Sequence, residues 1–264
     1  MRYIRYLAAC MLATSTFGVQ AKMVHKTVEW TQGGTQFHSV LVYDDASTAK
    51  RPGLVMVPNW FGVNDAAIKK AEDIAGKDYV ILLTDMYGAS VRPTPGHADQ
   101  AQAAVKPLYA DRKLMRARIN AALAQLRAQA GSAPIDTAKL GAIGFCFGGA
   151  VVLDLARSGA DVAAVVSFHG DLSTDDAKLA KHIKANVLAM NGADDTWTMK
   201  DADAFMAEMR QSPADWQFVV LGHAVHCFTE VGENSPGCKY DAKAAARSYR
   251  LMHGWLAGAF AGKP

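Results

Sequence analysis

Apolar runs along the chain alternate with polar stretches and predict a series of strands. Residues 27–30 and 36–43 have the partial alternation of antiparallel strands, and the two glycines at 33–34 form the turn between them. The next run, residues 53–58, is continuously apolar, as strands buried in a parallel sheet are. Further apolar runs predict strands at residues 79–83, 139–143, 162–168, 185–190 and 216–221.

Helical patterns separate these strands. The predicted helices span residues 64–75, 98–109, 111–129, 149–156, 200–209 and 241–256. Alternation of strands and helices predicts an α/β fold with a mostly parallel central sheet and helices on both faces. With 264 residues, of which 50% are hydrophobic, the chain is expected to form one domain over residues 22–264.

The first 21 residues have the order of a secretory signal peptide. Arg2 and Arg5 make a basic start, residues 6–19 are mostly apolar, and residues 19–21 form a small-residue cleavage site ending at Ala21. The apolar stretch is too short to span a bilayer comfortably. We therefore expect a periplasmic or secreted protein, cleaved after Ala21 and with no stable membrane insertion afterwards.

The small net charge of the chain argues against nucleic acid and anionic membranes as partners. The formal net charge is +3 and the chain has no sustained basic run, so neither nucleic acid nor an anionic membrane surface is an expected partner. The histidines lack the helical spacing of a zinc site, so no metal and no cofactor are expected. A single domain without an obvious exposed apolar helix predicts a monomer.

Residues 144–148 read Gly-Phe-Cys-Phe-Gly, between a predicted strand and a predicted helix. This is the setting of a nucleophile elbow, the sharp strand-to-helix turn that presents a nucleophile above a sheet, with Cys146 in place of serine. A helix N-terminus favours a thiolate there. The alternative is a glycine-rich turn around a structural cysteine.

Candidate acids and bases follow the elbow in the chain order of α/β-hydrolases, which is nucleophile, acid, histidine. Asp194 and Asp195 come just after one predicted strand, and His223 and His226 come just after the last. The ends of parallel strands are where such sheets gather functional groups. Taken singly, each of these residues also fits an ordinary turn or a polar loop.

Cysteine usage points to a free thiol at residue 146. After signal cleavage the chain keeps Cys146, Cys227 and Cys238, and an odd count in an exported protein suggests one pair and one free thiol. We expect a disulfide between Cys227 and Cys238, which flank a loop-like stretch. The alternative is that both are reduced.

Taken together, these motifs resemble the dienelactone hydrolase family of the α/β-hydrolase superfamily over residues 36–260. The matching residues are Asn-Trp-Phe-Gly-Val-Asn at 59–64, Asp-Met-Tyr-Gly at 85–88, Gly-Phe-Cys-Phe-Gly-Gly at 144–149, Phe-His-Gly at 168–170, Gly-Ala-Asp-Asp at 192–195 and His-Cys-Phe at 226–228.

The resemblance implies a carboxylic ester or lactone hydrolase with a Cys146–His226–Asp195 triad and a covalent acyl-enzyme. His226 matches the family's histidine because Phe228 follows two residues later, and Asp195 matches the acid because it is third after a glycine. It further implies that the backbone N–H groups of Trp60 and Phe147 form the oxyanion hole.

Three positions depart from the family's namesake, and one of them is Ala89, which stands where the namesake has one of two arginines for its substrate's carboxylate. Asn59 stands where the namesake has a glutamate that interacts with the resting thiol, and Glu230 stands where it has an arginine for its substrate's carboxylate. We therefore expect a standing Cys146–His226 ion pair and a substrate other than dienelactone. The predicted apolar pocket is formed by Asn59, Phe61, Tyr87, Trp197 and Phe228. The rival hypothesis is a non-catalytic or thiol-redox protein on a hydrolase fold.

Overall fold

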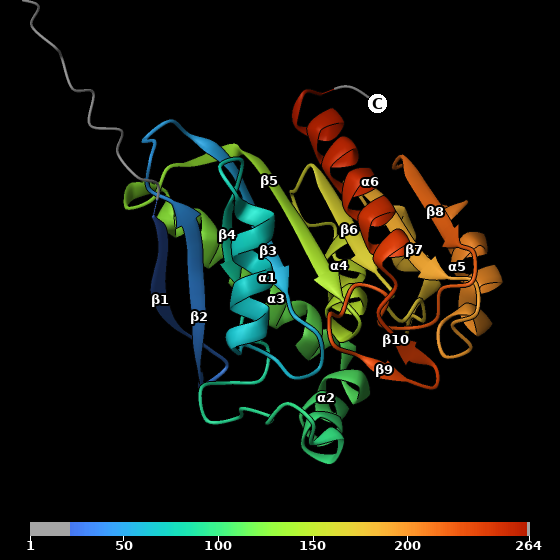
Figure 1. Cartoon of the computed structure of the whole chain (residues 1–264). Coiled ribbons are helices and arrows are strands. Elements are labelled where there is room, and N and C mark those ends of the chain that lie inside the picture. Colours follow the sequence, from blue (N-terminus) through green and yellow to red (C-terminus); the bar gives the residue numbers. More distant parts are fainter. Residues whose placement is uncertain (1–21, 263–264) are drawn as a thin grey trace, which may run out of the picture.

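A computed structural model describes residues 22–262 and contains one central sheet of eight strands (Figure 1). The strand order is β1-β2-β4-β3-β5-β6-β7-β8. β2 runs antiparallel to both its neighbours, and all pairs from β4 to β8 are parallel. The strands are β1 (Met23–Gln32), β2 (Thr35–Asp44), β3 (Arg51–Val57), β4 (Val80–Leu83), β5 (Ile135–Phe145), β6 (Ala164–Phe168), β7 (Asn186–Gly192) and β8 (Trp216–Leu221).

Helices cover both faces of the sheet, and each face has its own apolar core. In Figure 1, α1 and α6 lie in front of the sheet, while α3 and α4 lie behind it. This confirms the predicted mostly parallel α/β fold. The helices are α1 (Asp65–Ala75), α2 (Ala98–Ala110), α3 (Arg112–Ala128), α4 (Phe147–Arg157), α5 (Ala202–Met209) and α6 (Ala242–Phe260), with short 3-10 turns at Gln129–Gly131, Ala177–His182 and Met199–Asp201.

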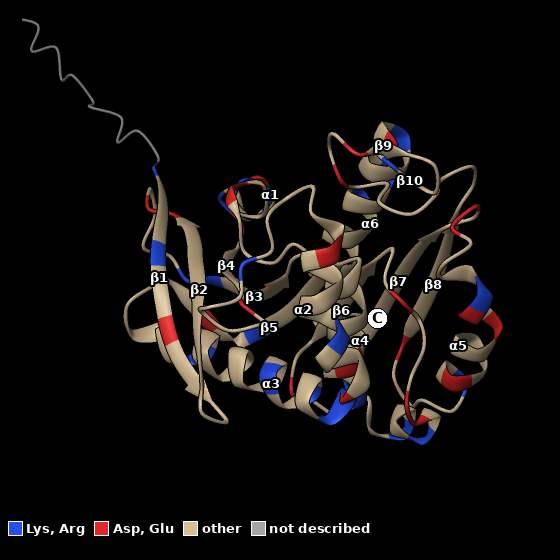
Figure 2. Cartoon of the chain, turned by 90° about the horizontal axis from the view of Figure 1, so that it is seen from below, with Lys and Arg blue, Asp and Glu red and all other residues tan. Residues whose placement is uncertain are grey.

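The helix starts follow from capping residues. The side chain of Asn64 accepts a hydrogen bond from the Ala67 N–H at the start of α1, and Asp111 and Asp241 cap α3 and α6 in the same way. α3 carries basic side chains and no acidic one (blue in Figure 2). Two of them, Arg112 and Arg116, pair with aspartates in the segment after β6, so that charge is balanced within the fold.

The carboxyl ends of the parallel strands meet at one edge of the sheet, at the bottom of Figure 1. α2 and a small hairpin of β9 (Asn234–Ser235) and β10 (Cys238–Lys239) lie beyond this edge. The hairpin was not anticipated from the sequence, because two-residue strands leave no apolar pattern. The expected signal peptide, residues 1–21, lies outside the described residues. Within residues 22–262, no helix combines the length and the apolar character needed to cross a membrane.

Candidate active site

Cys146 sits on the sharp turn between β5 and α4. Its φ of 55° is in the left-handed region, which costs energy for a residue with a side chain. A Cβ on Gly144 would lie 2.0 Å from the carbonyl oxygen of Gly148, and one on Gly148 would lie 2.1 Å from that of Val57. Only glycine fits at these two positions, so the Gly-Phe-Cys-Phe-Gly motif forms the predicted elbow.

Three strand ends bring Cys146, His226 and Asp195 into a hydrogen-bonded row. The Nε2 atom of His226, after β8, lies 3.1 Å from the Sγ atom of Cys146. On the other side of the ring, Nδ1 lies 2.7 Å from the Oδ2 atom of Asp195, which follows β7. Asp195 is buried and also accepts hydrogen bonds from Thr198, whose hydroxyl is 2.7 Å away. This is the order and spacing of a nucleophile, a base and an orienting acid.

The neighbouring candidates do not join this row. The structure leaves Asp194 exposed on the turn after β7, while its neighbour Asp195 points inward. His223 is exposed as well, on the turn before the segment that carries His226. Strand position alone did not decide between Asp194 and Asp195 or between His223 and His226. The structure brings Asp195 and His226 together.

Charge at the row favours an ion pair between Cys146 and His226. Burial opposes a positive charge on His226, but the Cys146 thiolate and the Asp195 carboxylate outweigh it and raise the pKa of His226 to about 10. Burial likewise opposes the charge on Asp195, but its hydrogen bonds from His226 and Thr198 hold the pKa of this carboxyl below its usual value. A protonated His226 ring is the resulting state at neutral pH.

The backbone N–H groups of Phe147 and Trp60 are the oxyanion donors that the family resemblance implies. Phe147 opens α4, and Trp60 lies in the loop after β3, against which the start of α4 packs. No group in residues 22–262 accepts a hydrogen bond from either N–H. The hydroxyl of Tyr87 donates to the carbonyl oxygen of Trp60 over 2.9 Å and so fixes this peptide. Two unpartnered donors beside a nucleophile suit the oxyanion of an acyl-transfer intermediate.

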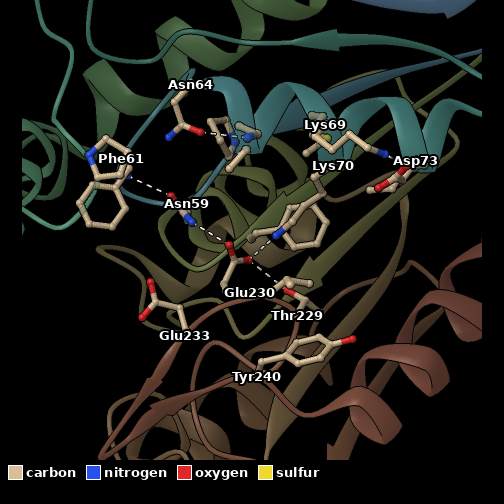
Figure 3. A pocket seen from close by; sticks show the side chains of 18 of the residues that line it. Asn59, Phe61, Asn64, Lys69, Lys70, Asp73, Thr229, Glu230, Glu233 and Tyr240 are labelled. Carbon is tan, nitrogen blue, oxygen red and sulfur yellow. Dashed lines mark hydrogen bonds and ion pairs between the residues drawn. The ribbon is translucent and has the colours of Figure 1, made fainter. Parts of the chain in front are cut away.

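The residues predicted to form an apolar pocket separate into three environments. Asn59 and Phe61 line a cavity of about 760 Å³ between α1, α6 and the segment after His226 (Figure 3). Trp197 is 54% exposed, and its ring centre lies 5.2 Å from that of His226. Tyr87 is buried, and its hydroxyl donates to the carbonyl oxygen of Trp60.

Phe228 is a correction to the sequence prediction. Its side chain is fully buried and packs edge-on against His169, with ring centres 4.9 Å apart. The backbone of Cys227 has a φ of 63°, which turns the chain just before Phe228. The ring consequently lies in the core beneath α6 rather than in the substrate pocket.

A disulfide joins Cys227 to Cys238 next to the histidine. It ties the residue after His226 to β10, and the Lys239 N–H donates to the His226 carbonyl oxygen over 2.9 Å. The β9–β10 hairpin thereby holds the backbone on which the imidazole sits. Among residues 22–262, Cys146 is the only cysteine outside a disulfide.

Sequence reasoning named His169 only within the Phe-His-Gly match at residues 168–170, and it missed Thr229 and Lys70. His169 is fully buried, and its Nδ1 lies 3.1 Å from the backbone nitrogen of Cys146. Lys70 forms an ion pair with Glu230, for which the sequence indicated no partner. The position of His169 just after β6, beside the elbow strand, was a usable signal. The pairing of Lys70 with a residue 160 positions later left none.

Comparison with known proteins places the chain in a family. The model of the dienelactone hydrolase family matches residues 37–260. A solved structure named m3DLH has a TM-score of 0.82 and 37% identity, covering 90% of this chain and 99% of its own. A dienelactone hydrolase-like promiscuous phosphotriesterase from metagenomic libraries has a TM-score of 0.80 and 38% identity, covering 89% of this chain and 98% of its own. A Bradyrhizobium protein named "Probable 2-oxo-3-(5-oxofuran-2-ylidene)propanoate lactonase" is 28% identical, covering 77% of this chain and 84% of that protein.

Proposed function

Because the chain belongs to the dienelactone hydrolase family and is a hydrolase of esters or lactones, we propose that Cys146 is its nucleophile, with His226 as acid and base and Asp195 as the orienting acid. The observation that carries this proposal is the row of side chains at strand ends, 3.1 Å from Sγ to Nε2 and 2.7 Å from Nδ1 to the carboxylate. In this proposal the enzyme acts as a monomer on a small ester or lactone.

Acylation begins from the ion pair. The Cys146 thiolate attacks the carbonyl carbon, and the N–H groups of Trp60 and Phe147 bind the oxyanion that forms. As the carbon–oxygen bond to the leaving group breaks, the His226 imidazolium donates its proton to the departing oxygen. An alcohol leaves, and the acyl group remains as a thioester on Cys146.

Deacylation uses the same histidine in the opposite sense. The thioester carries no charge, so the thiolate no longer helps to raise the pKa of His226, and the ring stays neutral after its proton has left. Neutral His226 takes a proton from water, whose oxygen attacks the thioester. The acid product departs and Cys146 leaves as a thiolate beside an imidazolium, which restores the starting pair.

The charges around the site favour an uncharged substrate. Glu230 is neutralised by Lys70 and accepts a hydrogen bond from Asn59 over 2.7 Å, so it presents no free charge to a ligand. Trp197 supplies apolar surface beside His226, and Phe61 supplies it at the cavity that it lines with Asn59; Cys146 and His226 do not line that cavity. We therefore propose neutral esters or lactones with apolar substituents as substrates. A redox role is less well supported, because no second thiol faces Cys146 within residues 22–262.

The raised pKa of His226 predicts different pH profiles for two acetate esters. Ethyl acetate releases an alkoxide that needs the imidazolium proton, whereas 4-nitrophenyl acetate releases a stable phenolate. As the pH rises through about 10, His226 loses its proton. We expect kcat/KM for ethyl acetate to fall about tenfold per pH unit beyond that point, while kcat/KM for the aryl ester stays level.

Both esters form the same acetyl-enzyme, so the comparison isolates the acylation step. Circular dichroism over the same pH range controls for unfolding. Parallel decline of both esters, or no decline of either, would contradict the role given to His226.

We also propose that the chain is exported and cleaved after Ala21. The basic, apolar and small-residue order of residues 1–21 supports this. The Cys227–Cys238 disulfide suits an oxidising compartment. N-terminal sequencing of the protein purified from its native cells is expected to begin at Lys22. A chain that still begins at Met1 would overturn export by cleavage.

A further inference from the structure

A chain of hydrogen bonds leads from the nucleophile into the core. The backbone N–H of Cys146 is shared between the carbonyl oxygen of Phe168, 3.0 Å away, and Nδ1 of His169, 3.1 Å away. The other ring nitrogen of His169 lies 2.7 Å from the hydroxyl of Thr229. That hydroxyl donates to a carboxylate oxygen of Glu230 over 3.1 Å. Glu230 in turn pairs with Lys70 (Figure 3). The Lys70 ammonium also lies over the ring of Phe145, 4.3 Å from its centre.

The charges of His226, Lys70 and Glu230 determine which atom donates in each of these hydrogen bonds. Burial and the nearby positive charges of His226 and Lys70 hold the pKa of His169 well below its usual value, so its ring is neutral and carries one proton. A carboxylate paired with a lysine can only accept, so Thr229 must donate to Glu230 and accept from His169. The His169 proton therefore lies on Nε2, which leaves Nδ1 free to accept from Cys146.

Glu230 also reaches the other side of the site. Its second oxygen accepts a hydrogen bond from the side-chain amide of Asn59 over 2.7 Å. The carbonyl oxygen of that side chain accepts from the backbone N–H of Phe61 over 3.0 Å. Asn59 and Phe61 bracket Trp60, so the same carboxylate holds the loop that presents the second N–H donor.

We propose that Glu230, held by Lys70, is a positioning residue that fixes the Cys146 backbone through Thr229 and His169, and the Trp60 loop through Asn59. This inference rests on the proposed function of Cys146. Glu230 touches neither the thiol nor the imidazole of His226, and it acts by setting the tautomer of His169 and the shape of the loop. A displaced nucleophile lowers the rate of acylation without weakening substrate binding in proportion.

The first test breaks the hydrogen-bond chain at Thr229. Thr229→Val keeps the side-chain shape and removes the hydroxyl, which leaves the Nε2–H of buried His169 without a partner. We expect the acylation rate constant for 4-nitrophenyl acetate to fall about tenfold, with KM changed by less than about twofold. Thr229→Ser restores a hydroxyl and is expected to recover most of the loss.

A second test changes which groups donate in the hydrogen-bond chain and keeps the size of the side chain at residue 230. Glu230→Gln can present either an acceptor or a donor to Thr229, so the tautomer of His169 is no longer fixed. Nitrogen-15 chemical shifts of the histidine rings are expected to show His169 as the Nε2–H tautomer in the wild type and as a mixture in Glu230→Gln. Glu233→Gln is the matched control, because Glu233 lines the same cavity without joining the chain (Figure 3).

These measurements separate the inference from the proposed function. If Thr229→Val acylates at the wild-type rate, or if Glu230→Gln leaves His169 wholly in the Nε2–H tautomer, the positioning role is overturned. If the wild type forms no acyl adduct at Cys146, the proposed function fails, and with it the catalytic part of the inference. The nitrogen shifts do not depend on catalysis and decide separately whether Glu230 sets the tautomer.

Discussion

Replacing Cys146 with alanine is expected to lower kcat for 4-nitrophenyl acetate by about 10⁴-fold or more, with little change in KM. The variant loses the atom that forms the acyl bond, while His226, Asp195 and the two backbone donors stay in place. A methyl group fits the space of the thiol, so the elbow keeps its shape and the protein is expected to remain folded by circular dichroism.

Cys146→Ser gives a graded comparison for the same position. A serine hydroxyl is protonated at neutral pH, so the standing ion pair with His226 is lost and the hydroxyl must be activated during the reaction. We expect its kcat to lie between those of the wild type and Cys146→Ala. If the alanine variant keeps more than about a tenth of wild-type kcat, Cys146 is not the nucleophile.

Gly148→Ala is expected to cause the largest loss of stability, about 3 kcal/mol or more in the free energy of unfolding. Its Cβ would lie 2.1 Å from the carbonyl oxygen of Val57 and 2.6 Å from that of Pro58. Both are backbone atoms at the end of β3, so relief requires α4 to move away from the sheet. That movement also separates the N–H groups of Trp60 and Phe147, so any folded fraction should acylate more slowly.

Gly254→Ala is the matched control for this substitution. Gly254 lies within α6, and a Cβ there would meet no atom within 4 Å. Alanine is the better helix former, so this variant should be more stable than the wild type by about 0.5–1 kcal/mol. Urea unfolding measures both variants. A Gly148→Ala protein within about 1 kcal/mol of the wild type would contradict the close contact between α4 and β3.

Much of the site was predictable because parallel strands end at one edge. Apolar runs located β5, β7 and β8, and the residues just after them supplied Cys146, Asp195 and His226. Strand position alone did not exclude Asp194 as the acid or His223 as the base, because the exact path of a turn decides which side chain points inward. The turn after β7 buries Asp195 and exposes its neighbour.

Other features depended on contacts between distant residues. Phe228 was placed in the pocket by its nearness to His226, and a left-handed residue between them turned it into the core instead. Glu230 stood out in the sequence as a departure from the family's arginine, but its ion-pair partner Lys70 lies far away in the sequence, on α1. No local pattern encodes such a pair, so the hydrogen-bond chain to Cys146 became visible only in three dimensions.

The covalent intermediate on Cys146 is the central claim, and rapid acid quenching tests it most directly. The enzyme is mixed with excess 4-nitrophenyl acetate, quenched within the first turnover, and analysed by intact mass and peptide mapping, with Cys146→Ala treated in parallel. We expect one acetyl group per chain, located on the peptide that contains Cys146, and none in the variant. Turnover without an adduct on Cys146, or an adduct that persists in Cys146→Ala, would contradict the account.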